Sequence, residues 1–152
     1  TNVSGVVRGG IIGGKKQTGK YKIDARFNKV ALADKIRKIA KLKTLIHISN
    51  KEASVFLKQM ENKLPERSLI FLDPPYYVKG ASLYYNHFSD KDHAILANNV
   101  NKYSKHWIVS YDNVKQVREL YKPYRFKTYS LNYSVKEHYK GSEVMFFSPG
   151  LY

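Results

Sequence analysis

Short apolar runs alternate with amphipathic stretches from residue 29 onward, and this alternation constrains the fold more than any other feature of the sequence. Branched and aromatic runs suit strands, and apolar residues that recur every three or four positions suit helices packed on a sheet. Strands that alternate with helices form a parallel sheet flanked by helices. The last two expected strands have no helix between them, which favours an antiparallel hairpin at the C-terminal edge. The pattern therefore predicts an α/β fold.

Periodicity and start or stop residues give the expected elements. Four helices are expected. The first covers 29–42 and faces a core, and the second begins at a Ser49-x-x-Glu52 capping box and carries Ala53, Phe56, Leu57 and Met60 on one face. The third begins at Ser89-x-x-Asp92 with Leu96, Ala97 and Val100 facing inward, and a short fourth helix is marked by Val114, Val117, Leu120 and Tyr121. Five strands are expected: 44–49, 69–72, 107–110, 125–134 and 143–148. The continuous apolar run 69–72 is typical of a strand buried on both faces.

The chain carries 27 Lys and Arg against 12 Asp and Glu, a formal net charge of +15. A field of this size attracts polyanions, so nucleic acid is the first partner to consider, with a basic bias of no functional meaning as the alternative. No apolar run is long enough for a membrane span, and the chain has no cysteine for disulfides. With no signal peptide and no cysteine, an intracellular setting is favoured. No His, Asp and Glu cluster has metal-ligand spacing, so we expect no metal.

Six of the nine glycines lie in the first nineteen residues, among basic side chains, and this segment is expected to form loops or a hairpin. The run Gly9-Gly10-x-x-Gly13-Gly14 is glycine-rich. However, it follows no buried strand and leads into lysines rather than an apolar helix, so it does not qualify as a cofactor loop.

The tetrapeptide Asp73-Pro74-Pro75-Tyr76 follows the expected strand 69–72, at the end of a sheet where ligands bind. The Asp73 carboxylate and the Pro74 carbonyl can each accept a hydrogen bond from an exocyclic amine, because successive prolines fix the backbone and keep that carbonyl out of a ladder. Tyr76 offers a face for base stacking, worth about 1–3 kcal/mol per base. The alternative is that the tetrapeptide is only a rigid turn and that the neighbouring Tyr77 is a packed aromatic residue.

Several further side chains have two interpretations. Tyr84, Tyr85, Asn86 and Phe88 are placed to stack on or wedge beside a displaced nucleotide. His93 is expected to cap or pack rather than to bind a ligand, and Trp107 is expected in the core. Lys136, His138 and Lys140 either contact a DNA backbone or form a solvated hairpin tip.

Five segments together resemble the C-terminal portion of the DNA adenine methylase family: TNVSGVVRGG, GKYKIDARFNK, SLIFLDPPYY, LYYNHFSDKDHAILA and WIVSYDN. The resemblance covers most of the chain. It implies a Rossmann-like methyltransferase sheet, S-adenosylmethionine as cofactor, double-stranded DNA as partner and a flipped adenine as substrate. It also implies a cytoplasmic protein, bacterial, phage-encoded or associated with the nucleoid; whether it belongs to a restriction-modification pair is left open.

The resemblance also assigns roles by position. Residues 1–28 match the remainder of a target-recognition segment, and residues 29–152 match the C-terminal half of the catalytic domain. Asp73, Pro74, Pro75 and Tyr76 form the catalytic motif, with Asp73 and Tyr76 beside the cofactor. Arg8 reads a guanine edge from a turn that includes Ser4, or alternatively contacts a phosphate. DNA contacts are expected from Arg8, Ser4, Lys15, Lys16, Lys20, Lys22, Asn86 and Lys140, with a solvated face as the alternative for the lysines.

One departure from the family concerns the cofactor, because the family's phenylalanine-glycine loop near the N-terminus is missing from this sequence. We therefore expect a sheet that is incomplete at the N-terminus, in a fragment or a split-gene product whose missing N-terminal half is a separate chain. Two alternatives to DNA adenine methylation remain. One is methylation of an amine in RNA or protein, which Asp73 disfavours because such motifs tend to begin with Asn. The other is a cofactor-deficient fragment that only binds DNA.

Overall fold

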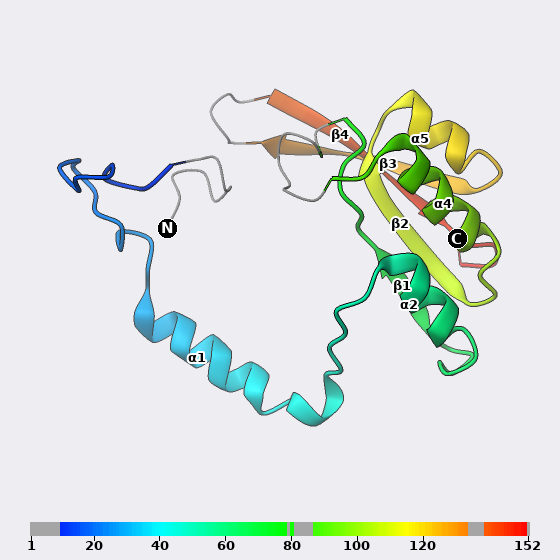
Figure 1. The fold of residues 1–152 in the computed structure, drawn as a ribbon, viewed down its shortest axis with the longest axis horizontal. Helices are drawn as coiled ribbons and strands as arrows, with labels where there is room; N and C mark the ends of the chain where they lie inside the picture. Colours follow the sequence, from blue (N-terminus) through cyan, green and yellow to red (C-terminus); the bar gives the residue numbers. More distant parts are fainter. Residues whose placement is uncertain (1–9, 79, 81–86, 134–138, 152) are drawn as a thin grey trace. The chain divides into compact units, whose positions relative to one another are not determined.

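The computed structural model describes residues 10–78, 80, 87–133 and 139–151, and the side chains of 131–140 are not among the described features. The chain divides into two compact units, Thr1–Asn50 and Lys51–Tyr152, hereafter the first and second unit. Figure 1 shows the elements of both. Each unit is considered by itself below.

The second unit is built on an open four-stranded sheet with the order β1-β2-β4-β3. Its strands are β1 (Leu69–Leu72), β2 (His106–Asp112), β3 (Arg125–Tyr133) and β4 (Tyr139–Phe147). β1 and β2 run parallel, whereas β4 is antiparallel to both β2 and β3. The expected α/β fold and its C-terminal antiparallel hairpin are thus confirmed, together with four of the five expected strands.

Helices α2 (Ala53–Met60), α4 (Asp90–Asn101) and α5 (Lys115–Leu120) cover one face of this sheet (Figure 1). α4 begins at the expected capping box, in which Ser89 and Asp92 exchange side-chain to backbone hydrogen bonds. The helices and the strands enclose a single cluster of buried side chains: Leu57, Leu96, Ala97, Val100, Tyr103, Trp107, Val109, Tyr111, Val117, Tyr121, Val144 and Phe146. The predicted inward face of α4, the presence of the short helix α5 and the core position of Trp107 are confirmed.

Side chains of β2 alternate between two environments, as the period of a strand requires. Trp107, Val109 and Tyr111 enter the core beneath the helices, each at most 2% exposed. Ser110 and Asp112 lie on the opposite face of the sheet, toward the loop that follows β1. One strand therefore supplies both the core and the neighbourhood of the Asp73 motif.

The prediction that 69–72 is buried on both faces is wrong. Ile70 and Leu72 pack against the core, whereas Leu69 is 52% and Phe71 55% exposed. β1 lies at the end of the strand order, and in the described part of the chain the helices cover only one face of it. A continuous apolar run gives no information about which faces are covered.

The capping box predicted at Ser49 is also wrong, because the N-cap of α2 is Glu52. The Glu52 carboxylate accepts hydrogen bonds from the backbone N–H groups of Ser54 and Val55, at 2.9 and 3.0 Å. These bonds, with that from Ser54 the larger cause, lower the pKa of Glu52. A carboxylate at an N-cap also suits the positive end of the helix dipole. Glu52 therefore takes the capping role that was expected of Ser49.

The first unit contains α1 (Lys29–Ala40), with Asn28 as its N-cap. The helix is confirmed, but its predicted core-facing role is not, because none of its residues is buried and Ile36 and Ile39 are more than half exposed. Apolar periodicity specifies a helix and its apolar stripe, not what covers that stripe.

The strand predicted at 44–49 is absent. A short 3-10 helix (Lys43–Leu45) is followed by residues 46–50 without regular structure. A strand needs a neighbour to satisfy its backbone, and none of the described strands pairs with this segment, in which Ile48 is 92% exposed. In the described parts of both units, no helix has the length and apolar character needed to cross a bilayer.

Candidate active site

The Asp73 motif begins where β1 ends, at the carboxyl end of a parallel strand. Asp73 is exposed, and Pro74, Pro75 and Tyr76 are half-buried. Because a proline has no N–H, the backbone cannot continue the ladder with β2 beyond this point. Ser110 of β2, itself 4% exposed, donates a hydrogen bond of 2.7 Å from its hydroxyl to Asp73 Oδ1. The Asp73 carboxylate is thus oriented by Ser110 and remains exposed to solvent.

The end of the loop is fixed by Asp112, also on β2. Its two carboxylate oxygens accept hydrogen bonds from the backbone N–H groups of Tyr77 and Val78, at 2.7 and 3.0 Å. Ser110 and Asp112 are two positions apart on one strand, so their side chains lie on the same face. Together they hold the segment from Asp73 to Val78 at both ends.

Sequence reasoning missed Ser110, Asp112 and Glu143 as neighbours of the motif. The segment WIVSYDN carried the resemblance, but no role was assigned to its polar residues. A signal was present, since two polar side chains two positions apart at the end of an apolar strand must lie on one face. That face adjoins the parallel strand that carries the motif.

Tyr76 is held by its hydroxyl, which donates to Glu143 Oε1 at 2.5 Å. Glu143 lies on β4, is 5% exposed and is the register partner of Asp112 on β2. The aromatic ring of Tyr76 is therefore fixed at its far end as well as at its backbone.

His93 of α4 packs behind the motif. It is 1% exposed, its Nδ1 is 2.8 Å from the Tyr111 hydroxyl, and its ring centroid is 4.7 Å from that of Tyr77 and 5.3 Å from that of Phe88. Burial lowers the pKa of His93, against the opposing effect of Asp112 and the two aspartates that begin α4. The packing role predicted for His93 is confirmed, and Phe88 packs against the core cluster and His93.

Other predicted site residues cannot be placed against this geometry. Ser4, Arg8, Tyr84, Tyr85, Asn86, Lys136 and His138 lie outside the described residues, as does the side chain of Lys140. Their expected contacts with DNA stay predictions.

The predicted phosphate-binding lysines lie in the first unit, all with exposed side chains: Lys15, Lys16, Lys20 and Lys22. Gln17 organises their loop, because its side-chain amide donates to the carbonyls of Ile12 and Gly14 and accepts from the N–H of Ile23. Lys22 donates to the Gln17 carbonyl at 2.6 Å, which directs one of the four lysines back to the loop.

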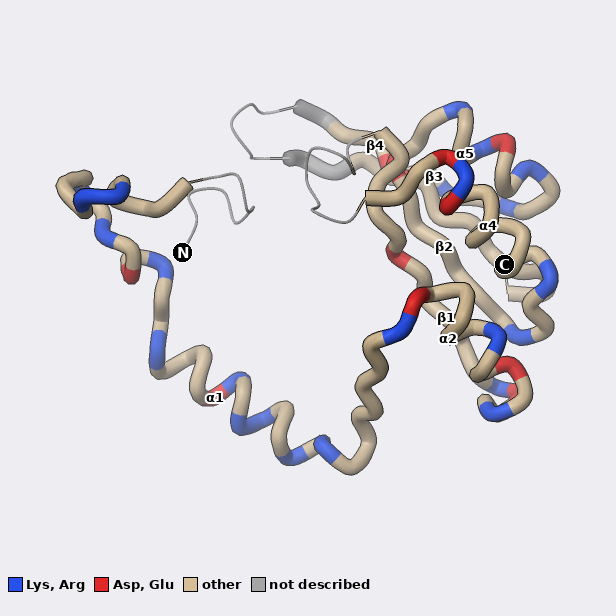
Figure 2. Tube along the Cα trace, viewed as in Figure 1, with Lys and Arg blue, Asp and Glu red and all other residues tan. Residues whose placement is uncertain are grey.

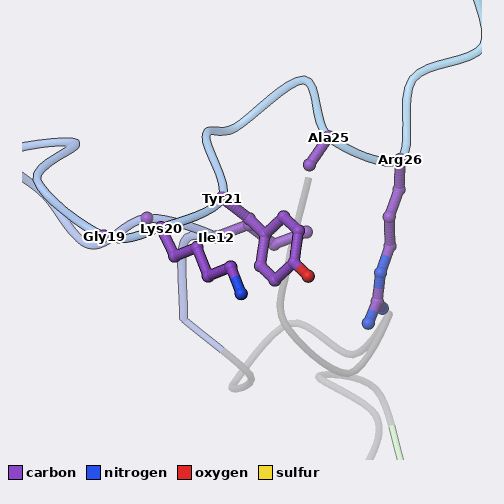
Figure 3. Close-up of a pocket in the computed structure, with 7 residues that line it drawn as sticks. Ile12, Gly19, Lys20, Tyr21, Ala25 and Arg26 are labelled. Carbon is purple, nitrogen blue, oxygen red and sulfur yellow. The ribbon is translucent and has the colours of Figure 1, made fainter.

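This loop borders a hollow in which basic and aromatic groups meet. Figure 3 shows the side chains of Lys20, Tyr21 and Arg26 along its wall. The Lys20 ammonium lies 5.7 Å from the centre of the Tyr21 ring. Residues 1–50 hold twelve of the 27 Lys and Arg but two of the twelve Asp and Glu, so basic charge is concentrated in the first unit (Figure 2).

The fold and the site together define a class of protein. A parallel strand that ends in an oriented carboxylate, two prolines and a tethered tyrosine suits the binding of a planar base through its amine, and the basic first unit suits a nucleic-acid substrate. Among the described residues, no group of three or more His, Asp and Glu side chains could hold a metal ion. The class is that of nucleic-acid amino-methyltransferases.

The family model for D12 class N6 adenine-specific DNA methyltransferases matches residues 13–136. The chain belongs to this family and is an enzyme, a DNA adenine N6-methyltransferase. No curated protein matches it.

Proposed function

We propose that the protein transfers a methyl group from S-adenosylmethionine to the N6 amine of an adenine that has been flipped out of double-stranded DNA, and that Asp73, Pro74, Pro75 and Tyr76 hold the base. The observation that carries this proposal is the Asp73 carboxylate, which Ser110 orients at the exit of β1 while its surface stays accessible. A buried or lysine-paired Asp73 would have argued against it.

The roles follow from hydrogen-bonding capacity. Asp73 accepts one hydrogen of the amine and the Pro74 carbonyl accepts the other, which leaves the nitrogen lone pair directed at the incoming methyl group. Tyr76 covers one face of the purine ring. Bound S-adenosylmethionine supplies an electrophilic methyl group on a sulfonium, and the chemistry needs no covalent enzyme intermediate.

The side chains that border the motif suit the cofactor in part. Asp73 and Tyr76 offer an acceptor and an aromatic face beside the reacting amine. Gly13, however, lies in a turn with a φ of +86°, and a Cβ at this position would meet the Tyr21 carbonyl oxygen at 2.6 Å. Gly13 therefore serves the close packing of its own loop, which supports the view that this glycine does not belong to a cofactor loop.

A second candidate function is DNA binding without cofactor binding or methyl transfer. It is motivated by the described residues, among which no glycine-rich loop connects a strand to a helix. In this proposal the four strands are part of a Rossmann-like sheet. Titration of S-adenosylmethionine into the protein by calorimetry separates the two candidates, because no detectable heat favours DNA binding alone.

We further propose that residues 1–28 belong to target recognition and residues 29–152 to the catalytic domain. We propose that phosphates are bound by Lys15, Lys16, Lys20 and Lys22, since a flexible ammonium positions DNA without specifying its sequence. Arg8 reads a guanine edge from the turn that includes Ser4, and Asn86 and Lys140 contact the same duplex.

The catalytic proposal is tested with Asp73→Ala and Asp73→Asn. Asp73→Ala removes an acceptor from the reacting amine, so labelled-methyl transfer to duplex DNA should fall by at least about 100-fold. Asp73→Asn keeps one acceptor oxygen, so its rate of methyl transfer should fall less than that of Asp73→Ala. Asp34→Ala, which breaks an exposed ion pair with Arg37 on α1, is the control.

Salt-sensitive DNA binding should be unchanged in all three variants, because Asp73 contacts the base and not the backbone. A parallel loss of binding and transfer in Asp73→Ala would contradict the assigned role. Transfer to RNA in preference to duplex DNA would contradict the proposed substrate.

A further inference from the structure

Glu143 is a buried carboxylate beside the proposed base pocket. It lies on β4, opposite Asp112 of β2 and Tyr129 of β3, and it is 5% exposed. Directly opposed residues of antiparallel strands share a face of the sheet. Asp112, Glu143 and Tyr129 therefore form a polar row across three strands, on the face opposite the buried Val144 and Phe146.

Two tyrosine hydroxyls donate to this carboxylate. Tyr76 donates to Oε1 at 2.5 Å, and Tyr129 donates to Oε2. Tyr129 is a cross-strand neighbour within the hairpin, whereas Tyr76 comes from the loop after β1, 67 positions away in the sequence. A buried carboxylate is costly unless it accepts hydrogen bonds, and such charge-assisted bonds are short and strong. The hairpin thus holds Glu143, and Glu143 holds the outer end of Tyr76.

We propose that Glu143 is a positioning residue that fixes where the Tyr76 ring lies, and so the wall against which the extruded adenine stacks. The proposal rests on the role assigned to Tyr76 above. A tyrosine side chain has several staggered positions about χ1, so the backbone alone does not fix where the ring lies. A hydrogen bond at the hydroxyl holds the far end of the ring axis before the base arrives, and a preformed wall loses less entropy on binding.

The strand register makes the tether specific to this ring. Glu143 and Asp112 are paired across β2 and β4, and Asp112 fixes the backbone of the two residues that follow Tyr76. Tyr76 is therefore held on one side by its own hydroxyl and on the other by the loop backbone. The two groups that hold Tyr76 and its loop are the carboxylates of Glu143 and Asp112, which are register partners on β4 and β2.

The experiment uses the full chain and a single-stranded oligonucleotide that carries one 2-aminopurine. A single strand presents the base already unpaired, so extrusion from a duplex is not required. Stacking on Tyr76 should quench the fluorescence of the probe, and titration gives the affinity. The variants are Tyr76→Ala, Tyr76→Phe, Glu143→Gln and the double variant Tyr76→Phe/Glu143→Gln, with Tyr129→Phe as the matched control.

Tyr76→Phe keeps the ring and removes the tether, and Glu143→Gln removes the charge that strengthens it. Each should weaken probe binding by about tenfold, the scale of one hydrogen bond to a charged group. The double variant should bind no more weakly than the weaker single variant, because both changes act on the same bond. Tyr129→Phe removes a different donor to Glu143 and leaves Tyr76 bonded, so probe binding should weaken by at most about twofold.

The outcomes separate this inference from the proposed function. If Tyr76→Ala abolishes quenching while Glu143→Gln and Tyr76→Phe bind as the unmodified protein does, the tether is refuted and the base pocket stands. If Tyr76→Ala quenches normally, both fail. A loss in Tyr129→Phe as large as that in Tyr76→Phe shows a general structural role for Glu143 and overturns the proposal. Should Glu143→Gln not fold, as judged by thermal denaturation, the comparison of Tyr76→Phe with Tyr129→Phe decides alone.

Discussion

The Ser110 hydroxyl lies beneath the Asp73 carboxylate, to which it donates a bond of 2.7 Å. Ser110→Ala removes this bond without changing the strand. We expect kcat for methyl transfer to fall by about tenfold, with little change in KM for DNA, because the orientation of the acceptor matters most when the amine reacts. Steady-state kinetics with duplex DNA measures both constants.

The control for Ser110→Ala is Ser148→Ala. Ser148 is 5% exposed and accepts a hydrogen bond from the Trp107 N–H at 3.1 Å, away from the motif. This variant should lose stability and keep its kcat. Equal losses of kcat in the two variants would assign Ser110 a structural role only.

His93 makes a second prediction at the residue scale, because its burial lowers its pKa below the ordinary value of 6.5. Between the folded and the ordinary pKa the unfolded chain binds a proton that the folded chain does not. The free energy of unfolding should therefore be constant with respect to this group above about pH 6.5 and fall as the pH decreases below it.

His93→Gln removes the titration while keeping a group that can bond the Tyr111 hydroxyl. Urea unfolding between about pH 5 and about pH 7.5 should show a weaker pH dependence in this variant. His47→Gln, at an exposed position, should keep the original dependence. An unchanged slope in His93→Gln would contradict the prediction.

At the residue scale, the sequence predicted those features that depend on residue type and on neighbouring positions in the chain. The location of the Asp73 motif at the end of β1, the packing of His93 and the core position of Trp107 could all be predicted from residue type and context. Ser110, Asp112 and Glu143 could not, because their partners in the motif are 34 to 67 positions away. A serine or a glutamate in a strand gains a role only through the residue that the sheet register places opposite it.

Helix α4 carries the prediction at the scale of elements. Ser89→Ala removes the side-chain acceptor of the capping box, leaving the Asp92 N–H without its cap. The free energy of unfolding should fall by about 1 kcal/mol. Urea denaturation measures it, and Lys91→Ala, an exposed change in the same turn, should stay within about 0.5 kcal/mol of the unmodified protein.

Elements with strong local signals were predicted closely. β1 has the bounds that its apolar run indicates, and α4 begins at its capping serine. The predictions that were wrong concern which strand a segment pairs with and which residues cover a helix. Residues 44–49 have strand composition and no strand to pair with, and α1 has an apolar stripe that none of the described residues buries. Pairing and coverage are tertiary properties, which propensity and periodicity do not contain.

The uneven distribution of charge gives a prediction for the whole molecule. If the lysines of the first unit bind phosphates, Lys15→Ala, Lys16→Ala and Lys20→Ala should each weaken DNA binding and reduce the slope of log affinity against log salt by about 1. Lys58→Ala, an exposed change on α2, should leave the slope unchanged. Fluorescence anisotropy with duplex DNA at several salt concentrations measures the slopes. Equal slopes in all four variants would exclude a specific role for the first unit.

The alternation along β2 also bears on how this protein can change over time. Trp107, Val109 and Tyr111 support the core, while Ser110 and Asp112 hold the proposed base pocket, so neighbouring positions serve the core and that pocket separately. Point substitutions can therefore tune either property without the other. A one-residue insertion or deletion within the strand would exchange the two faces and damage both at once. Lineages of this enzyme should thus vary in the length of their surface loops and not in the length of this strand.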